Sequence, residues 1–285
     1  MTAMTNDEAT SAYQWTGARG DKWRATLTGM EATLAPLDEP LLEALELGDG
    51  PLRIADVGCG GGGTTLALAR RAPAGSVVRG FDISPALIAA ARERPRDADV
   101  DVTFEVADAA KALPVDAPFD RLASRLGVMF FDDPPAAFAN LARWLAPGGR
   151  LAFVVWGRTA DNPWMTSVRD AAAPVIDVPR PEPDSPGPFR YGHPEPLLAL
   201  FAGAGFRDVQ ARAWQGQLPI GGGLPPAAAA EFALASFSSF AEQLAKAGPG
   251  AHARVLSSLA TRFEASQRDG VVWLDGRAHV VTAVR

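Results

Sequence analysis

The sequence contains few of the side chains from which disulfides and metal centres are built. Only one of its 285 residues is cysteine and only three are histidine. A single cysteine cannot form an internal disulfide, and the spaced cysteine and histidine pairs of a zinc site are lacking. We therefore expect a protein without disulfides and without a bound metal ion.

Long apolar runs and clusters of basic residues are lacking too. No apolar stretch approaches the roughly 20 residues that a helix needs to cross a bilayer, and residues 1–17 are too polar and acidic for a signal peptide. The formal net charge is −6, and no group of lysines and arginines forms the basic patch typical of nucleic-acid binders. We expect a cytoplasmic protein whose partner is a small molecule, and neither a membrane nor a nucleic acid. The sequence does not indicate the oligomeric state.

What the sequence does contain is an alternation of β-rich and helical stretches between residues 51 and 157. This alternation is typical of a parallel α/β sheet of the Rossmann-like kind, with helices on both faces. The predicted strands are 52–58, 77–83, 100–108, 119–126 and 150–156, with helices after the first strand, over 85–94 and over 135–145.

After residue 157 the alternation stops. Prolines crowd residues 174–196, which indicates a loop or lid, and a helix over 197–204 then precedes a strand over 206–214. Helices are predicted over 227–246 and 251–266. Near the C-terminus, Asp275-Gly276 separates two β-rich runs, 271–274 and 278–284, and this dipeptide predicts a hairpin turn.

Chemistry is indicated by the glycine-rich stretch that follows the first predicted strand. Five of the six residues 58–63 are glycine, and a strand that runs through glycines into a helix lets a ligand approach the backbone and the helix N–H groups. Gly58, Gly60 and Gly63 also fit the dinucleotide pattern, with Asp82 where a ribose-binding acid belongs. A nicotinamide-dependent oxidoreductase is therefore one alternative.

Carboxylates around the glycine loop favour a methyl donor instead. Asp56 directly precedes the loop, where it can meet a cationic amino group, and Asp82 and Asp108 end successive strands, where they suit ribose hydroxyls and an adenine amino group. A pyrophosphate would be repelled by this much negative charge. The hydride-transfer pair Tyr-x-x-x-Lys is also missing, since the two tyrosines are Tyr13 and Tyr191.

Five motifs together resemble the class I S-adenosylmethionine-dependent methyltransferases of the ubiquinone and menaquinone biosynthesis type. They occur in the order of that family and cover roughly residues 50–157: ADVGCGGG at 55–62, GFDIS at 80–84, VADAAKALP at 106–114, FDRLASRLGVMFFDDP at 119–134 and LAPGGRLAFVVW at 145–156. Further on, GAGFRDV at 203–209 and HVVTAVR at 279–285 resemble the last helix and terminal strands of the family.

The resemblance implies a seven-stranded, mostly parallel sheet with an antiparallel last strand, in one domain. Within it, 1–50 would be an N-terminal helical segment, 51–157 the donor-binding core, 158–196 and 215–266 a substrate cover, and 197–214 with 267–285 the rest of the sheet. The donor S-adenosylmethionine, and S-adenosylhomocysteine as its product, would be held by residues of the core. These are Asp56, Gly58, Cys59, Gly60, Asp82, Ile83, Asp108, Ala109 and Ser124.

The acceptor is predicted less sharply. Where family members that methylate amino nitrogens often carry Asn/Asp-Pro-Pro-aromatic, this chain has residues 124–127, Ser-Arg-Leu-Gly, so the resemblance favours an oxygen or carbon acceptor. Methyl transfer can proceed by positioning alone, and a base is needed only if the acceptor must lose a proton. His193, at the end of the proline-rich stretch, is the candidate base. A donor-binding protein without catalytic activity is a further alternative.

Overall fold

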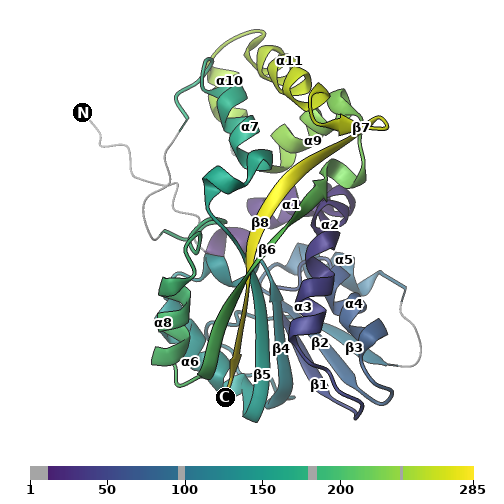
Figure 1. Ribbon diagram of the computed structural model, residues 1–285, viewed down its shortest axis with the longest axis vertical. Helices are drawn as coiled ribbons and strands as arrows, with labels where there is room; N and C mark the ends of the chain where they lie inside the picture. The colour runs from purple at the N-terminus through teal and green to yellow at the C-terminus, as the bar shows by residue number, and fades with distance from the viewer. Residues whose placement is uncertain (1–11, 96–99, 179–184, 238–239) are drawn as a thin grey trace.

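The computed structural model describes residues 12–95, 100–178, 185–237 and 240–285 (Figure 1). Its centre is a sheet in the strand order β3-β2-β1-β4-β5-β8-β6, with the short strand β7 paired to β8 alone. The strands are β1 (Arg53–Val57), β2 (Val77–Asp82), β3 (Asp101–Val106), β4 (Phe119–Arg125), β5 (Leu145–Trp156), β6 (Arg207–Pro219), β7 (Gln267–Arg268) and β8 (Val271–Val284). β1 to β5 are parallel, and β8 runs antiparallel to both β5 and β6. The Rossmann-like class and the antiparallel last strand are thus confirmed.

Helices cover both faces of the sheet. The helices α4 (Gly63–Arg71) and α5 (Pro85–Arg92) lie along β2 and β3, and α3 (Asp38–Ala44) packs near β4, β5 and β8. The helices α6 (Pro134–Trp144) and α8 (Glu195–Gly203) lie near β5 and β6 (Figure 1). Sequence-coded caps start two of them, because Ser84 Oγ accepts from Leu87 N and Asp133 Oδ1 accepts from Ala136 N. Between helix and sheet, the buried rings of Phe81 and Trp144 lie 5.0 Å apart.

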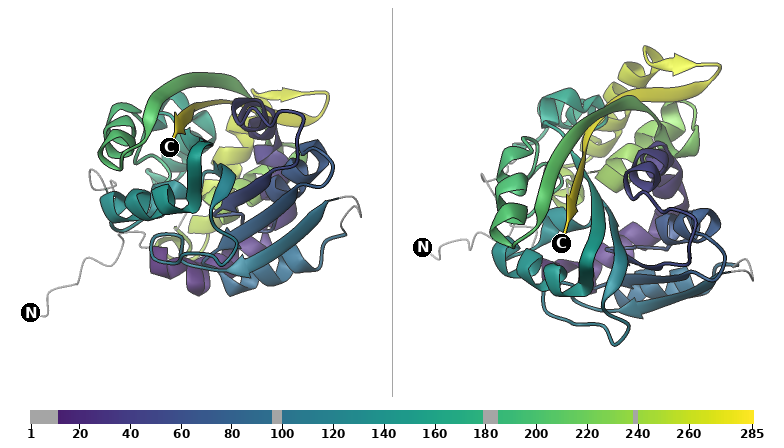
Figure 2. Two further views of the ribbon diagram at one scale, coloured as in Figure 1. Left: turned by 90° about the horizontal axis from the view of Figure 1, so that it is seen from below. Right: turned by 60° about the horizontal axis from the view of Figure 1, so that its bottom comes forward.

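A second group of helices lies beyond the carboxyl ends of the parallel strands, at the top of Figure 1. It consists of α7 (Pro163–Ala172), α9 (Pro226–Phe237), α10 (Ala241–Lys246) and α11 (Ala251–Glu264), and we call these four the helical layer. Val255, Leu259 and Phe263 are buried at four-residue spacing on α11, which gives the helix one apolar face against α7 and α9. The long strands β6 and β8 connect the sheet to this layer (Figure 2).

The predicted N-terminal helical segment is helical in its described part. It contains the 3-10 helix η1 (Ala12–Thr16), α1 (Ala18–Ala25), α2 (Leu27–Leu34), η2 (Ala35–Leu37) and α3. Residues 1–11, on which the signal-peptide prediction also rested, lie outside the described residues.

Two predictions about the C-terminal third are wrong. Asp275-Gly276 forms no hairpin, because β8 continues through it and pairs with β6 at Gln217↔Asp275 and Gly216↔Gly276. A long neighbouring strand satisfies the backbone here, which outweighs the local turn preference. The predicted helix over 227–246 is interrupted, since α9 ends at Phe237 and α10 begins at Ala241. The strands β5 and β6 are also longer than predicted, beginning at Leu145 and ending at Pro219.

Candidate functional site

The glycine loop lies where the strand order reverses, with β2 on one side of β1 and β4 on the other. Open α/β sheets bind their ligands in the crevice at this switch point, beyond the carboxyl ends of the strands. Gly58, Gly60 and Gly62 have φ of +69°, +54° and +84°, a region that side chains with a Cβ disfavour. A Cβ on Gly58 would also approach Gly127 Cα to 2.9 Å, so the loops after β1 and β4 touch only because both residues are glycine.

Asp82 joins the end of β2 to the glycine loop. One of its oxygens accepts from Gly60 N at 2.8 Å and the other accepts from Ser84 N at 2.8 Å. Burial raises the pKa of the Asp82 carboxyl, and the two backbone hydrogen bonds oppose this. Each carboxylate oxygen has a second lone pair, so the group can still accept hydroxyl protons from a ligand.

Asp56 is fully buried below the loop and only half satisfied. Its Oδ2 accepts from Thr65 Oγ1 at 2.7 Å, whereas Oδ1 has no hydrogen-bond partner among the residues that the structure describes. Burial raises its pKa to about 7, with Thr65 and Arg125 acting in the opposite direction. A buried carboxylate oxygen without a donor costs free energy, and it suits a ligand that brings a cationic N–H.

An ion pair that the sequence interpretation missed lies beside Asp56. Arg125 Nη1, at the end of β4, is 3.1 Å from Asp38 Oδ1 on α3, and the same oxygen accepts from Thr64 Oγ1 at 3.0 Å. Burial raises the pKa of Asp38, although Arg125 opposes this. The pair connects α3 and α4 to β4 below the glycine loop. Its signal in the sequence was an arginine that directly follows the apolar stretch Leu122-Ala123 and the buried Ser124 at the end of β4.

The loop after β3 carries the third predicted acid. Asp108 accepts from Ala110 N at 3.0 Å and pairs with Lys111 Nζ at 3.1 Å. Asn140, on α6, donates to the carbonyl oxygens of Ala109 and Ala112 at 2.9 and 2.6 Å. Asn140 therefore fixes the loop that presents Asp108, and its polar side chain on an apolar helix face was the overlooked signal.

The remaining predicted residues of the core have structural contacts of their own. Ser124 is fully buried and donates from Oγ to Val57 O at 2.7 Å, so its hydroxyl joins β4 to β1. Cys59 is buried, and burial raises the pKa of its thiol well above the usual range, which keeps it protonated. Ile83 is partly buried between Asp82 and Ser84.

The N-terminal segment (residues 12–34) lies across the glycine loop. Gly63 N donates to Glu31 Oε1 at 3.2 Å, and a Cβ on Gly61 would meet the Leu27 side chain at 2.4 Å. A Cβ on Gly20 would come within 2.3 Å of Ser84 Oγ, so α1 lies directly on the start of α5. The loop is thus enclosed between the sheet and the first helices.

Part of this chain is similar in sequence to known proteins. Residues 54–149 match the model of a family described as methyltransferase domain. A demethylmenaquinone methyltransferase from Thermus thermophilus is 42% identical over 108 residues, which are 38% of this chain and 48% of that protein. The chain spans less than half of the length of the curated relatives it matches.

Two solved structures extend the likeness beyond residue 149. Phosphoethanolamine N-methyltransferase 2 of Haemonchus contortus has a TM-score of 0.55 at 18% identity, covering 94% of this chain and 60% of that one. The fold is that of the class I methyltransferases. The (4+2)-cyclase SpnF shares it, with a TM-score of 0.50 at 23% identity over 88% of this chain and 80% of that one.

In this methyltransferase fold, aromatic side chains fill the joint between the sheet and the helical layer. The ring of Trp164 on α7 lies 4.9 Å from Trp156, 5.6 Å from Phe189 and 4.9 Å from Phe237. Buried Asn162 holds this joint, because it donates to Arg158 O and Arg277 O and accepts from Trp164 Nε1. Sequence reasoning did not find Asn162.

His193 lies apart from the glycine loop. Its side chain is exposed in the turn before α8, next to Gly192, whose carbonyl oxygen is 3.1 Å from Nε2 of His279 on β8. The pKa of the Asp161 carboxyl is lowered, mainly by its hydrogen bond with Arg158, and nearby His193 makes a smaller contribution. The turn of His193 thus lies against β8 and precedes α8, whereas the glycine loop directly follows β1.

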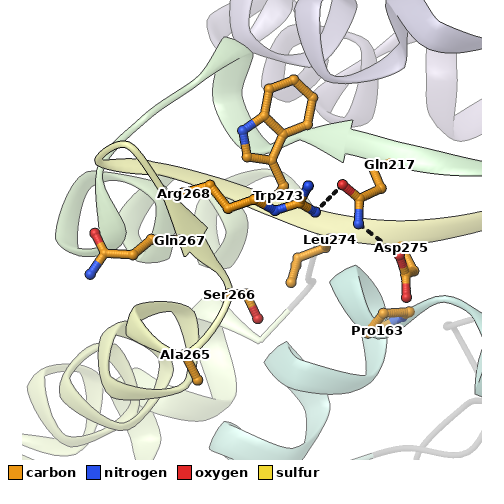
Figure 3. A pocket seen from close by; sticks show the side chains of 9 residues that line it. All are labelled: Pro163, Gln217, Ala265, Ser266, Gln267, Arg268, Trp273, Leu274 and Asp275. Carbon is orange, nitrogen blue, oxygen red and sulfur yellow. Dashed lines mark hydrogen bonds between the residues drawn. The ribbon is translucent and has the colours of Figure 1, made fainter.

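The described residues contain no group of three or more His, Cys, Asp or Glu side chains that could hold a metal ion. None of the helices in this part of the chain has the length and apolar character needed to cross a membrane. A surface hollow of about 420 Å³ lies beside β7, where Gln217 bonds to Arg268 and Asp275 (Figure 3). None of the predicted site residues lines it.

Proposed function

We propose that this protein transfers a methyl group from S-adenosylmethionine to a small organic acceptor. The observation that carries the proposal is the buried Asp56 with its unsatisfied Oδ1, directly below a glycine loop at the switch point of a methyltransferase fold. The positive charge of oxidised NAD lies on a pyridinium nitrogen that has no N–H to donate to this oxygen, whereas the amino-acid end of S-adenosylmethionine has an ammonium group. The match of residues 54–149 to the methyltransferase domain supports the same assignment.

The residues around the crevice fit the parts of this donor. Gly58 and Gly60 leave room above the backbone for its methionine part, and Asp82 accepts from the ribose hydroxyls. Ile83, Asp108 and Ala109 border the adenine, and Cys59 and Ser124 support the loop and strand beneath. The Haemonchus contortus structure contains S-adenosylhomocysteine, in agreement with this donor.

Catalysis then rests on positioning. The bound donor supplies a methyl group on a positively charged sulfur, which is already activated for displacement. The protein has to bring the acceptor atom in line with that methyl group and exclude water, and such positioning can supply a large part of the rate enhancement. The residues 158–196 and 215–266, which include the helical layer, form the cover that does so in our proposal.

The acceptor atom is proposed to be oxygen or carbon. The end of β4 and the start of the loop after it have the sequence Ser-Arg-Leu-Gly at 124–127, and Gly127 packs on Gly58. The Thermus thermophilus relative supports an acceptor of the quinone-precursor kind. Nitrogen is the second candidate, because the Haemonchus contortus protein is an N-methyltransferase.

Two experiments, one on binding and one on turnover, separate this proposal from two other functions. Calorimetry with S-adenosylmethionine, S-adenosylhomocysteine and NAD should give heat for the first two, in the micromolar range common for small cofactors. Tight binding of NAD alone would overturn the proposal in favour of an oxidoreductase. The cyclase SpnF shows that this fold occurs outside methyl transfer, so release of S-adenosylhomocysteine during turnover must also be measured.

A further inference from the structure

A cationic and aromatic cluster on the N-terminal segment belongs to none of the contacts assigned to the donor. The guanidinium carbon of Arg19, on α1, lies 5.1 Å from the ring centroid of Trp15 and 5.6 Å from that of Phe130. The rings of Trp15 and Phe130 are 5.1 Å apart, edge to face. Phe130 belongs to η3 (Val128–Phe130), the turn that follows β4.

Within the described part of the chain, two hydrogen-bond donors in this cluster lack acceptors. Trp15 Nε1 is buried and has no hydrogen-bond partner among the described residues. No carboxylate of the described chain is within ion-pair distance of Arg19 or affects its titration; desolvation alone lowers its pKa to about 10. A buried N–H and a desolvated cation that find no partner among the described residues would both be costly without an added acceptor.

A neighbouring cation adds to the positive potential. Burial and the charge of Arg19 both lower the pKa of Lys22, one turn further along α1. Like charges held close together repel, and the chain as a whole carries a net charge of −6. The positive charge of Arg19 above the crevice is therefore a local feature, one that an anion would stabilise.

The cluster lies where the N-terminal segment, η3 and the segment that leads into α8 meet. Gly187 N donates to Met129 O at 3.2 Å, and the Arg190 guanidinium donates to Phe131 O. Both neighbours of Phe130 in the chain are thus bonded to the segment that leads into α8. The cluster thus lies between the N-terminal segment over the glycine loop and the segment before α8, which belongs to the cover assigned to the acceptor in the proposed function.

We propose that Arg19 and the Trp15 N–H bind a negatively charged group, a carboxylate or a phosphate, of the methyl acceptor. This inference rests on the proposed function and names a substrate class for it: acceptors that carry an anionic group next to an apolar or aromatic part. The buried acids Asp56 and Asp82 would repel such a group, and Arg19 offsets that repulsion.

The indole N–H signal of Trp15 reports occupancy directly. In ¹H–¹⁵N NMR spectra the seven tryptophans give separate indole peaks, and Trp15→Phe identifies the peak of Trp15. Benzoate and inorganic phosphate are titrated into protein saturated with S-adenosylhomocysteine. We expect at least one of them to shift the Trp15 peak saturably. Arg19→Gln should weaken that binding on the order of tenfold to a hundredfold, because it removes charge-assisted hydrogen bonds.

Controls separate this result from loss of structure. Arg19→Lys keeps the charge and should retain part of the affinity, and Arg24→Gln, on the exposed side of the same helix, should leave it unchanged. Absence of a saturable shift with either anion would overturn the inference.

The anion that binds Arg19 and the Trp15 N–H could also be the carboxylate of the donor itself. 5′-Methylthioadenosine, which lacks the amino-acid part of the donor, distinguishes the two sources. If S-adenosylhomocysteine itself shifts the Trp15 peak and blocks the anions, while 5′-methylthioadenosine does neither, the site belongs to the donor and the inference is wrong. Failure of S-adenosylhomocysteine to bind in calorimetry would instead overturn the proposed function.

Discussion

Replacement of Asp56 by Asn tests the buried carboxyl on which the donor assignment depends. Burial raises its pKa in the folded protein from 3.8 to about 7. Between these values the folded protein holds a proton that the unfolded chain has released. The stability due to this proton is complete below the unfolded pKa and is lost as the pH rises through 7.

The size of the effect follows from the shift. A change of one pKa unit corresponds to about 1.4 kcal/mol, so the full shift corresponds to about 4 kcal/mol. Between pH 5 and pH 8 the wild-type protein should lose about 2 to 3 kcal/mol of unfolding free energy through this group. An Asn at position 56 has no proton to release, and its carbonyl oxygen can still accept from Thr65 Oγ1.

Urea unfolding of wild type and Asp56→Asn at pH 5 and pH 8 measures this difference. The variant should gain stability relative to wild type as the pH rises. Asp101→Asn is the control, because Arg79 lowers the pKa of Asp101 and its titration is complete below pH 5. Parallel pH profiles for wild type and Asp56→Asn would show that Asp56 does not titrate in this range and would refute the argument.

The same variant also tests the contact with the donor. An ammonium group beside Asp56 stabilises the ionised carboxylate, so binding of S-adenosylhomocysteine to wild type should strengthen as the pH rises through 7. Calorimetry across that range should show no such strengthening for Asp56→Asn. An equally steep pH dependence in both proteins would separate Asp56 from the ligand.

Three further outcomes are expected. Asp82→Ala should weaken donor binding on the order of tenfold to a hundredfold in calorimetry, because charge-assisted hydrogen bonds to the ribose are worth roughly 1.5–3 kcal/mol; an unchanged Kd would leave Asp82 as a link between Gly60 and Ser84 only. His193→Asn should keep near-normal turnover, since the imidazole is exposed and positioning is the proposed mechanism; a fall of ~10²-fold or more with donor affinity intact would identify a general base. Residues 158–178 and 225–264 should gain protection from hydrogen exchange when donor and acceptor bind, and equal protection in both states would contradict a cover.

The local pattern of the sequence determined the core of this protein. Alternating strands and helices, a glycine loop after the first strand and acids at successive strand ends were sufficient to predict the α/β class and the positions of Asp56, Asp82 and Asp108. These features follow from contacts between residues near in sequence or from the rule that parallel strands end at one edge of a sheet. In this core, the preferences of neighbouring residues are therefore sufficient to predict the structure.

Only the tertiary structure decided the features that depend on distant partners. β8 continues through Asp275-Gly276 because β6, more than fifty residues earlier, supplies hydrogen bonds along its whole length. Among the described residues, Asp56 Oδ1 and Trp15 Nε1 are buried without a hydrogen-bond partner. Such burial depends on what every other segment covers. The sequence shows that a charged or polar side chain is present. The free-energy cost of burying that side chain depends on the neighbours that folding brings to it.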